Sequence, residues 1–150
     1  MEIDKLMTED LMFLDMSCTD KKDCICQMAN ALFAAGRIKD KEVYVNAVLE
    51  REKTGPTGIG MQSAIPHGKS AAVEIPSLAF ARCDAGVDFQ APDHSLANLI
   101  FLIAVPETTA DLHLKMLSEL ARSLMHADFR EKILKAETKQ EILSILRGGN

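Results

Sequence analysis

The sequence contains no tryptophan and one tyrosine, and aromatic residues make up only 5% of its 150 residues. Proteins that hold single-stranded nucleic acids stack the bases on aromatic side chains, so this composition argues against such a surface. The 17 basic residues are outnumbered by 22 acidic ones, for a net charge of −5, and they are scattered along the chain. Duplex-binding domains and polybasic membrane-binding segments both need a basic patch. The composition therefore predicts no nucleic-acid partner.

A long hydrophobic run is also absent. The longest, residues 99–105, is far shorter than the roughly 20 residues that a membrane-spanning helix needs. The first ten residues are acidic and lack the continuous apolar stretch of a signal peptide. We therefore expect no direct membrane insertion and a cytoplasmic protein.

The cysteines and glycines match no cofactor motif. Cys18, Cys24, Cys26 and Cys83 do not have the spacing of a zinc site. The dinucleotide fingerprint and the Walker loop would each require glycine at position 63, which is Ser63. The sequence thus predicts reduced thiols, with neither a metal nor an organic cofactor.

Several segments carry apolar residues at the spacing of an amphipathic helix. The first follows Asp20 and has its apolar stripe at Ile25, Met28, Ala29, Leu32 and Phe33. Further helices are predicted to begin at Asp40, at Thr108 or Thr109, at Asp128, and at the capping box formed by Thr138 and Glu141.

Two segments read as strands, residues 77–83 and 96–105, and the second is apolar enough to be covered on both faces. Residues 63–66 form a short extended piece that Pro66 ends. Residues 54–60 hold three glycines and one proline, which predicts irregular structure. The order of these elements predicts a single α/β domain, a mixed β-sheet flanked by helices in an α/β/α sandwich.

His67 is the most distinctive candidate for chemistry. It lies in Ala-Ile-Pro-His-Gly-Lys at residues 64–69, where Pro66 stiffens the chain before it and Gly68 lets the backbone turn after it. We expect it at the end of the short strand, with N–H groups of the upstream glycine-rich loop available to an anion. The alternative is an ordinary histidine in a Pro-Gly turn.

His113 and Arg51 are the other candidates. His113 is in register with Met116 and Leu117, so it faces inward near a helix N-terminus that follows a buried strand, a place that favours anions. Arg51 ends the second helix and leads into the glycine-rich loop, where a guanidinium can pair with a phosphate. The alternatives are a core histidine bonded to the backbone and a solvated charge at a helix end.

The remaining polar residues of interest are interpreted as solvated surface: His94, His126, Glu50, Glu52, Asp88 and Asp93.

Arg51-Glu52, followed by Thr-Gly-Ile-Gly at 57–60 and by residues 64–69, resembles the signature of the fructose/mannitol-type enzyme IIA domains (EIIA type 2). These domains belong to the bacterial phosphoenolpyruvate-dependent sugar phosphotransferase system, the PTS. The resemblance continues through Val-Asp-Phe-Gln-Ala-Pro-Asp at 87–93 to the helix that carries His113. It assigns residues 1–150 to one such domain, with a core of about residues 5–146.

The resemblance implies a phosphoryl relay. A member of this family accepts a phosphoryl group from the phosphohistidine of HPr and passes it to a cysteine of a IIB domain, which phosphorylates the sugar during uptake through the membrane domain IIC. By this resemblance His67 is the acceptor, as a tele-phosphohistidine, while His113 and Arg51 stabilise the phosphoryl group. A fructose-like sugar is implied, although IIA itself contacts only the partner proteins.

Two readings stay open beside the sugar relay. One is a regulatory protein of the same fold that resembles the nitrogen-type IIA proteins and acts by phosphorylation-dependent protein binding. The other is a small α/β ligand- or metal-binding domain that uses His67, His113 and a cysteine. The sequence also departs from the family pattern at Gln62, where a glycine is usual, and at Ser63, where an apolar residue is usual.

Overall fold

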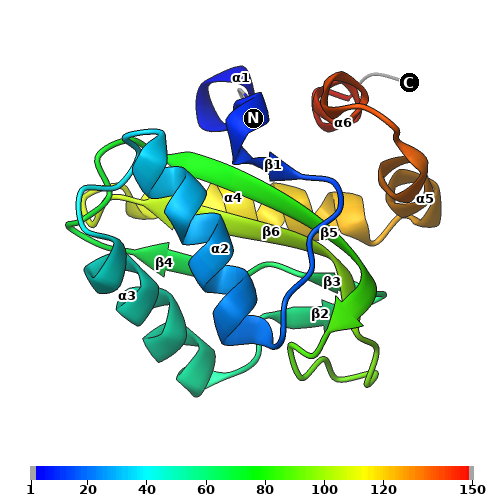
Figure 1. The fold of residues 1–150 in the computed structure, drawn as a ribbon, viewed down its shortest axis with the longest axis horizontal. Coiled ribbons are helices and arrows are strands. Elements are labelled where there is room, and N and C mark those ends of the chain that lie inside the picture. The colour runs from blue at the N-terminus through cyan, green and yellow to red at the C-terminus, as the bar shows by residue number, and fades with distance from the viewer. Residues whose placement is uncertain (1–2, 149–150) are drawn as a thin grey trace.

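The computed structural model describes residues 3–148 as helices packed on both faces of a six-stranded mixed sheet (Figure 1). The helices are α1 (Ile3–Leu6), the 3-10 turn η1 (Glu9–Leu11), α2 (Lys21–Ala34), α3 (Lys41–Thr54), α4 (Ala110–Leu124), α5 (Ala127–Lys135) and α6 (Lys139–Leu146). The strands are β1 (Met12–Phe13), β2 (Gly58–Gly60), β3 (Ser63–Ala64), β4 (His67–Lys69), β5 (Ser77–Val87) and β6 (Ala97–Val105). The predicted α/β architecture is confirmed.

The sheet is built around the long antiparallel pair β5 and β6. Its strand order is β1-β5-β6-β3-β2, and β4 pairs with β6 beyond β3. Strands β3 and β4 run parallel to β6, and β1 runs parallel to β5. Phe80 and Phe101 face each other across the central pair, with ring centroids 4.9 Å apart. A strand placed so centrally must be apolar on both faces, which explains the nearly unbroken apolar run of β6.

The two faces of the sheet carry separate cores. Helices α2 and α3 cover one face, where they pack on the even-numbered residues of β6, Ile100, Leu102 and Ala104. Helix α4, with α1, α5 and α6, packs on the odd-numbered residues, Leu99, Phe101, Ile103 and Val105. The period of two along β6 therefore assigns each residue to one layer of the sandwich.

The predicted helix starts are largely where the sequence placed them. The carboxylates of Asp20 and Asp40 accept N–H bonds from Asp23 and Val43 at the starts of α2 and α3. Thr138 caps α6 in the same way, and Thr109 precedes α4. Helix α5 begins one residue earlier than predicted, after His126.

The prediction of irregular structure for residues 54–60 is wrong at its end. Gly58–Gly60 form β2, which pairs antiparallel with β3. Glycine is needed there because a Cβ at Gly58 would lie 2.7 Å from the carbonyl oxygen of Phe89. The last three residues of the glycine-rich segment therefore form an edge strand that passes close to another backbone, although their glycine content predicted irregular structure.

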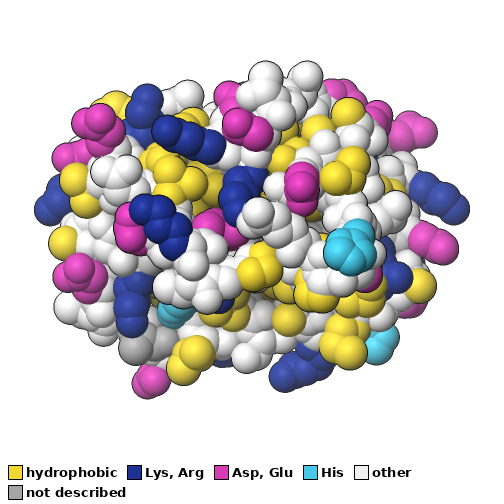
Figure 2. All heavy atoms as spheres, turned by 90° about the horizontal axis from the view of Figure 1, so that it is seen from below, with side chains coloured by type: hydrophobic (Ala, Val, Ile, Leu, Met, Phe, Trp, Pro, Cys, Tyr) yellow, Lys and Arg dark blue, Asp and Glu magenta, His cyan; other side chains and the backbone are white. Residues whose placement is uncertain are grey.

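Charged side chains of both signs are interspersed over the face of the molecule that Figure 2 shows. Within residues 3–148, no helix combines the length and the apolar character needed to cross a membrane.

Candidate active site

His67 opens β4, whereas the sequence analysis expected it to end a strand. Strands β3 and β4 lie along the same edge of β6, and residues 65–66 interrupt that edge just before His67. Pro66 has no N–H to donate to the ladder. Gly68 packs against α3 so closely that a Cβ would lie 2.8 Å from Cγ2 of Val48. Since successive side chains of a strand alternate, His67 and Lys69 point to the opposite face, where α4 lies.

The His67 imidazole is buried, with 6% of its residue surface exposed, and one ring nitrogen is fixed. Nδ1 lies 2.9 Å from the carbonyl oxygen of Ile65. A carbonyl oxygen only accepts hydrogen bonds, so Nδ1 carries the proton in the neutral ring. The lone pair is therefore on Nε2.

The surroundings of His67 favour its neutral form. Burial lowers the pKa of His67 below its ordinary value, against the opposing effect of the hydrogen bond to Ile65. The Arg51 charge lowers the pKa further, and the Glu52 charge raises it. A neutral imidazole with its proton on Nδ1 offers a nucleophilic nitrogen at pH 7.

His113 lies in the first turn of α4, beside His67. The two ring centroids are 4.9 Å apart, with the ring planes tilted by 55°. Nε2 of His113 is buried and has no hydrogen-bond partner among residues 3–148. Burial lowers the pKa of His113, and the neighbouring His67, Lys69 and Arg51 lower it further. An imidazole with an unsatisfied, buried Nε2 thus lies beside the His67 ring.

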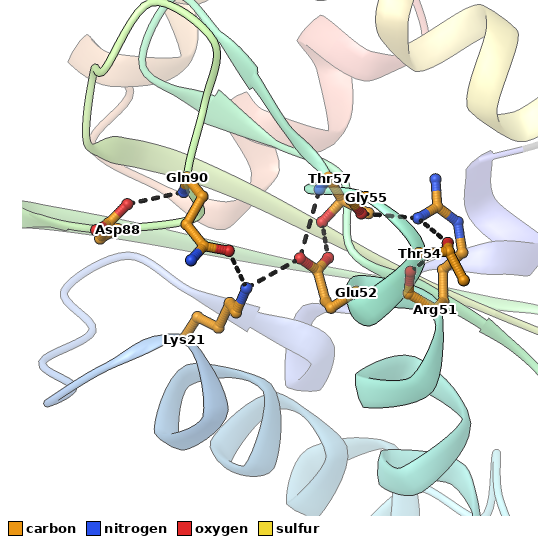
Figure 3. A network of polar contacts seen from close by, with 8 residues as sticks. All are labelled: Lys21, Arg51, Glu52, Thr54, Gly55, Thr57, Asp88 and Gln90. Carbon is orange, nitrogen blue, oxygen red and sulfur yellow. Dashed lines mark hydrogen bonds and ion pairs between the residues drawn. The ribbon is translucent and has the colours of Figure 1, made fainter.

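Arg51 lies in the last turn of α3, as predicted. Its Nη1 donates to the carbonyl oxygen of Gly55 at 2.8 Å and to Oγ1 of Thr54 at 3.0 Å. Its charge is close enough to lower the pKa of both histidines. Figure 3 shows the guanidinium on the opposite side of the loop from the Glu52 carboxylate. The charge of Arg51 thus acts on both histidines, while its guanidinium is hydrogen-bonded to the end of its own helix.

Glu52 is not the solvated charge that the sequence analysis expected. It is 7% exposed, and its carboxylate accepts hydrogen bonds from the hydroxyl and the N–H of Thr57 (Figure 3). Lys21 forms an ion pair with it at 3.3 Å. The signal was present in the helical spacing, because Glu52 follows the buried residues Tyr44 and Val48 at intervals of four.

In the glycine-rich segment 54–60, the N–H of Gly55 donates to the carbonyl oxygen of Glu52 at 3.3 Å and that of Thr57 to the Glu52 carboxylate at 3.4 Å, so these two N–H groups are used within the protein. The turn that follows this segment is also bonded internally. The N–H of Met61 donates to Asp93 at 2.8 Å, and that of Gln62 donates to Oγ of Ser95 at 3.2 Å. The bonds from Met61 and Ser95 lower the pKa of Asp93 to about 2. Asp93 is exposed, as predicted, but it anchors the turn between β2 and β3.

The other histidines lie away from this cluster on the surface. His94 and His126 are exposed, as predicted. Within the described range 3–148, no three His, Cys, Asp or Glu side chains are grouped so as to hold a metal ion.

Comparison with known proteins places this site in a family. The phosphoenolpyruvate-dependent sugar phosphotransferase system EIIA 2 family matches residues 5–148. The PTS system fructose-specific EIIA component of Haloferax volcanii is 41% identical over 97% of this chain and 94% of its own.

Two solved structures have the same fold. Nitrogen regulatory protein IIA-Ntr of Neisseria meningitidis superposes with a TM-score of 0.83 at 32% identity, covering 95% of this chain and 97% of its own. The mannitol enzyme IIA of Escherichia coli, solved in complex with phosphorylated enzyme IIB, gives a TM-score of 0.81 at 26% identity, with the same coverage of 95% and 97%. The family match and the fructose-specific relative confirm the resemblance seen in the sequence: the chain belongs to the EIIA 2 family of the phosphoenolpyruvate-dependent sugar phosphotransferase system.

Proposed function

We propose that this EIIA domain, residues 1–150, receives a phosphoryl group from phospho-HPr on Nε2 of His67 and passes it to a cysteine of a IIB domain. The observation that carries the proposal is the bond from Nδ1 of His67 to the Ile65 carbonyl. It leaves Nε2 as the ring nitrogen with a lone pair, in a site where burial keeps the imidazole neutral. A neutral nitrogen nucleophile allows the transfer to proceed in two covalent steps.

Both steps balance without a cofactor. In the first, the Nε2 lone pair forms a bond to phosphorus while the N–P bond of the HPr phosphohistidine breaks and its electron pair returns to that imidazole. In the second, a IIB cysteine thiolate forms an S–P bond, the N–P bond at His67 breaks, and its electron pair returns to Nε2. The proton on Nδ1 stays in place throughout, because the Ile65 carbonyl accepts it in both states.

His113 and Arg51 are assigned to stabilising the phosphoryl group. The transferred group carries its charge on three oxygens, so the site needs mainly positioning and positive electrostatics. His113 has an unsatisfied Nε2 next to His67, available to donate to a phosphoryl oxygen once protonated. The Arg51 guanidinium supplies a positive charge, and its two bonds to the helix end both use Nη1.

The partners follow from the same role. HPr is the proposed donor and a IIB domain the proposed acceptor, with IIC in the membrane complex; the Escherichia coli mannitol IIA–IIB complex is the relevant precedent. A relay that exchanges phosphate with HPr acts in the cytoplasm. The 41% identical Haloferax volcanii relative is fructose-specific, which favours a fructose-type IIB partner.

A regulatory role is the second candidate. The observation that favours it is the likeness to nitrogen regulatory protein IIA-Ntr, at 32% identity with a TM-score of 0.83. Such a protein accepts the phosphoryl group on the same histidine and controls other proteins through its phosphorylation state. The higher identity to the fructose-specific relative leads us to favour the sugar relay.

The proposal is tested by incubating the protein with labelled phosphoenolpyruvate, enzyme I and HPr. We expect one acid-labile phosphoryl group per chain, none in His67→Ala, and wild-type labelling in His94→Ala, where the replaced histidine is exposed. Absence of label on the wild-type protein would contradict the relay, and label on His67→Ala would contradict the acceptor assignment. Onward transfer to a panel of IIB domains distinguishes the sugar relay, which passes its label on, from the regulatory protein, which keeps it.

A further inference from the structure

The buried carboxylate of Glu52 lies beside the site and has no part in the phosphoryl chemistry proposed above. Burying a carboxylate is costly unless it is paired and hydrogen-bonded. Here the Lys21 ammonium lies 3.3 Å from one oxygen, and the Thr57 hydroxyl donates to the other. The Lys21 ammonium also donates to the side-chain oxygen of Gln90 at 2.9 Å, which joins α2 and the 88–90 segment to the end of α3 (Figure 3).

From this carboxylate a continuous series of hydrogen bonds leads to the acceptor imidazole. The N–H of Thr57 donates to Glu52 at 3.4 Å, and the carbonyl of Thr57 accepts from the N–H of Ile65 at 3.0 Å. The carbonyl of Ile65 then accepts from Nδ1 of His67 at 2.9 Å. Thr57 and Ile65 each bond through both their N–H and their carbonyl, so fixing one end of the series restricts the other.

The series matters because Ile65 lies where the edge strand is interrupted. Strand β3 ends at Ala64 and β4 begins at His67, so Ile65 lies between the two strands. Its N–H donates to the carbonyl of Thr57, which continues the β2–β3 pairing one residue beyond Gly58 and Ala64. The orientation of the Ile65 carbonyl, and hence the proton position on His67, therefore depends on where Thr57 is held.

We propose that Glu52 is a positioning residue for His67, acting through Thr57 and Ile65. It fixes the carbonyl that keeps the His67 proton on Nδ1 and the lone pair on Nε2. This inference rests on the proposed function for its consequence in phosphoryl transfer, but the tautomer of His67 can be observed without any transfer.

The test compares Glu52→Gln and Thr57→Val with the wild-type protein. Glu52→Gln keeps the size of the side chain but removes the charge that Lys21 and Thr57 engage; Thr57→Val removes the hydroxyl donor and keeps the shape. Thr57→Ser restores the hydroxyl. Glu50→Gln is the matched control, two residues away on the same helix, with its side chain 70% exposed and paired only with Lys53 in the described contacts.

Two quantities are measured in each protein, alongside its melting temperature. Nitrogen-15 NMR of the histidine rings reports which nitrogen of His67 carries the proton, and labelling by phospho-HPr reports the rate of acceptance. We expect the population with the proton on Nε2 to rise in Glu52→Gln and Thr57→Val and the labelling rate to fall roughly tenfold or more, as misplacement of a reacting group does. Thr57→Ser should recover most of this loss, and Glu50→Gln should match the wild type.

The outcomes separate this inference from the proposed function. Wild-type protein that takes no label overturns the relay, whereas the NMR comparison still decides the role of Glu52. A Glu52→Gln protein that melts earlier but keeps the wild-type tautomer and labelling rate makes Glu52 purely structural and overturns the inference. If Glu52→Gln does not fold, Thr57→Val alone decides: a wild-type tautomer and labelling rate in that variant overturn the inference, and altered ones support it.

Discussion

The imidazole rings of His67 and His113 lie with their centroids 4.9 Å apart, and the pKa of each is lowered by burial. Two rings at this distance also repel each other when both are protonated, so both imidazoles are neutral at pH 7. A phosphoryl group on Nε2 of His67 would bring negative charge to the buried edge of His113. That negative charge would raise the pKa of His113 and favour its protonated form.

The first prediction concerns His113→Ala. We expect the variant to be labelled by phospho-HPr, because the nucleophilic nitrogen belongs to His67, but to pass the label to IIB at least about 100-fold more slowly, the order of loss seen when one stabilising donor is removed. Single-turnover transfer to a IIB domain measures this, with His126→Ala as the control because that ring is exposed. Onward transfer at the wild-type rate would show that His113 does not act on the phosphoryl group.

Stability should fall on acidification in a window set by the two histidines. Their pKa values are lowered in the folded state, while the unfolded chain titrates near 6.5. Between these values the unfolded state binds more protons, so the free energy of unfolding rises with pH and reaches its plateau above about pH 7. Carboxylates titrate below this window, near or under pH 4 in the unfolded chain.

Urea unfolding between pH 5 and 8 checks this dependence. The free energy of unfolding should decrease as the pH drops below about 6.5, in line with the histidine value in unfolded chains. The double variant His67→Gln/His113→Gln should have a flatter profile in the same range. An equal slope in both proteins would mean that these histidines are not titrating with lowered pKa values.

The sequence was sufficient for the layers of the fold, because these depend on patterns within one segment, whereas the roles of the three candidate site residues stay predictions. Helical spacing located α2 and α4, and the apolar run located β6. The positions that were missed depend on contacts between distant segments. Gly58 is in a strand because it pairs with Ala64, and it must be glycine because Phe89 passes close to it. Glu52 can be buried because Lys21, 31 residues away, pairs with its charge. Composition and spacing do not contain those partners.

Gln62 departs from the usual family residue, and the structure explains what the departure costs. Met61 and Gln62 have φ of 55° and 62°, the left-handed conformations of a two-residue hairpin turn between β2 and β3. Glycine adopts this conformation without the clash of a Cβ. We expect Gln62→Gly to raise the free energy of unfolding by about 0.5–1 kcal/mol, the usual order of such local strain.

The matched control for this change is Gln140→Gly in α6, where glycine should instead cost about 1 kcal/mol or more, because it lowers helix propensity and removes the bonds from Gln140 to Glu9. Both are measured by urea unfolding. The prediction is contradicted if Gln62→Gly destabilises the protein as Gln140→Gly does. The change should leave labelling of His67 intact, since the Gln62 side chain is exposed.

The residue after His67 sets the distance between β4 and α3. A Cβ on Gly68 would lie 2.8 Å from Cγ2 of Val48 and 3.1 Å from Cε1 of Tyr44, so β4 or α3 must shift to admit it. Tyr44 is itself anchored, because its hydroxyl donates to the carbonyl oxygen of Ile103 at 2.8 Å. Gly68→Ala should therefore lower the free energy of unfolding by about 1–3 kcal/mol, as overpacking does, and slow the labelling of His67.

A double-mutant cycle with Val48→Ala separates overpacking from an effect on the unfolded chain. Val48→Ala alone leaves a cavity and destabilises the protein, but it also removes the methyl group that the new Cβ would meet. If the contact is the cause, the double variant loses less stability than the sum of the two single changes, by about 0.5 kcal/mol or more. Strictly additive changes in the free energy of unfolding would place the cost of Gly68→Ala in the unfolded state or in a general shift of β4. Recovery of His67 labelling in the double variant would show that the position of the acceptor depends directly on the packing of β4 on α3.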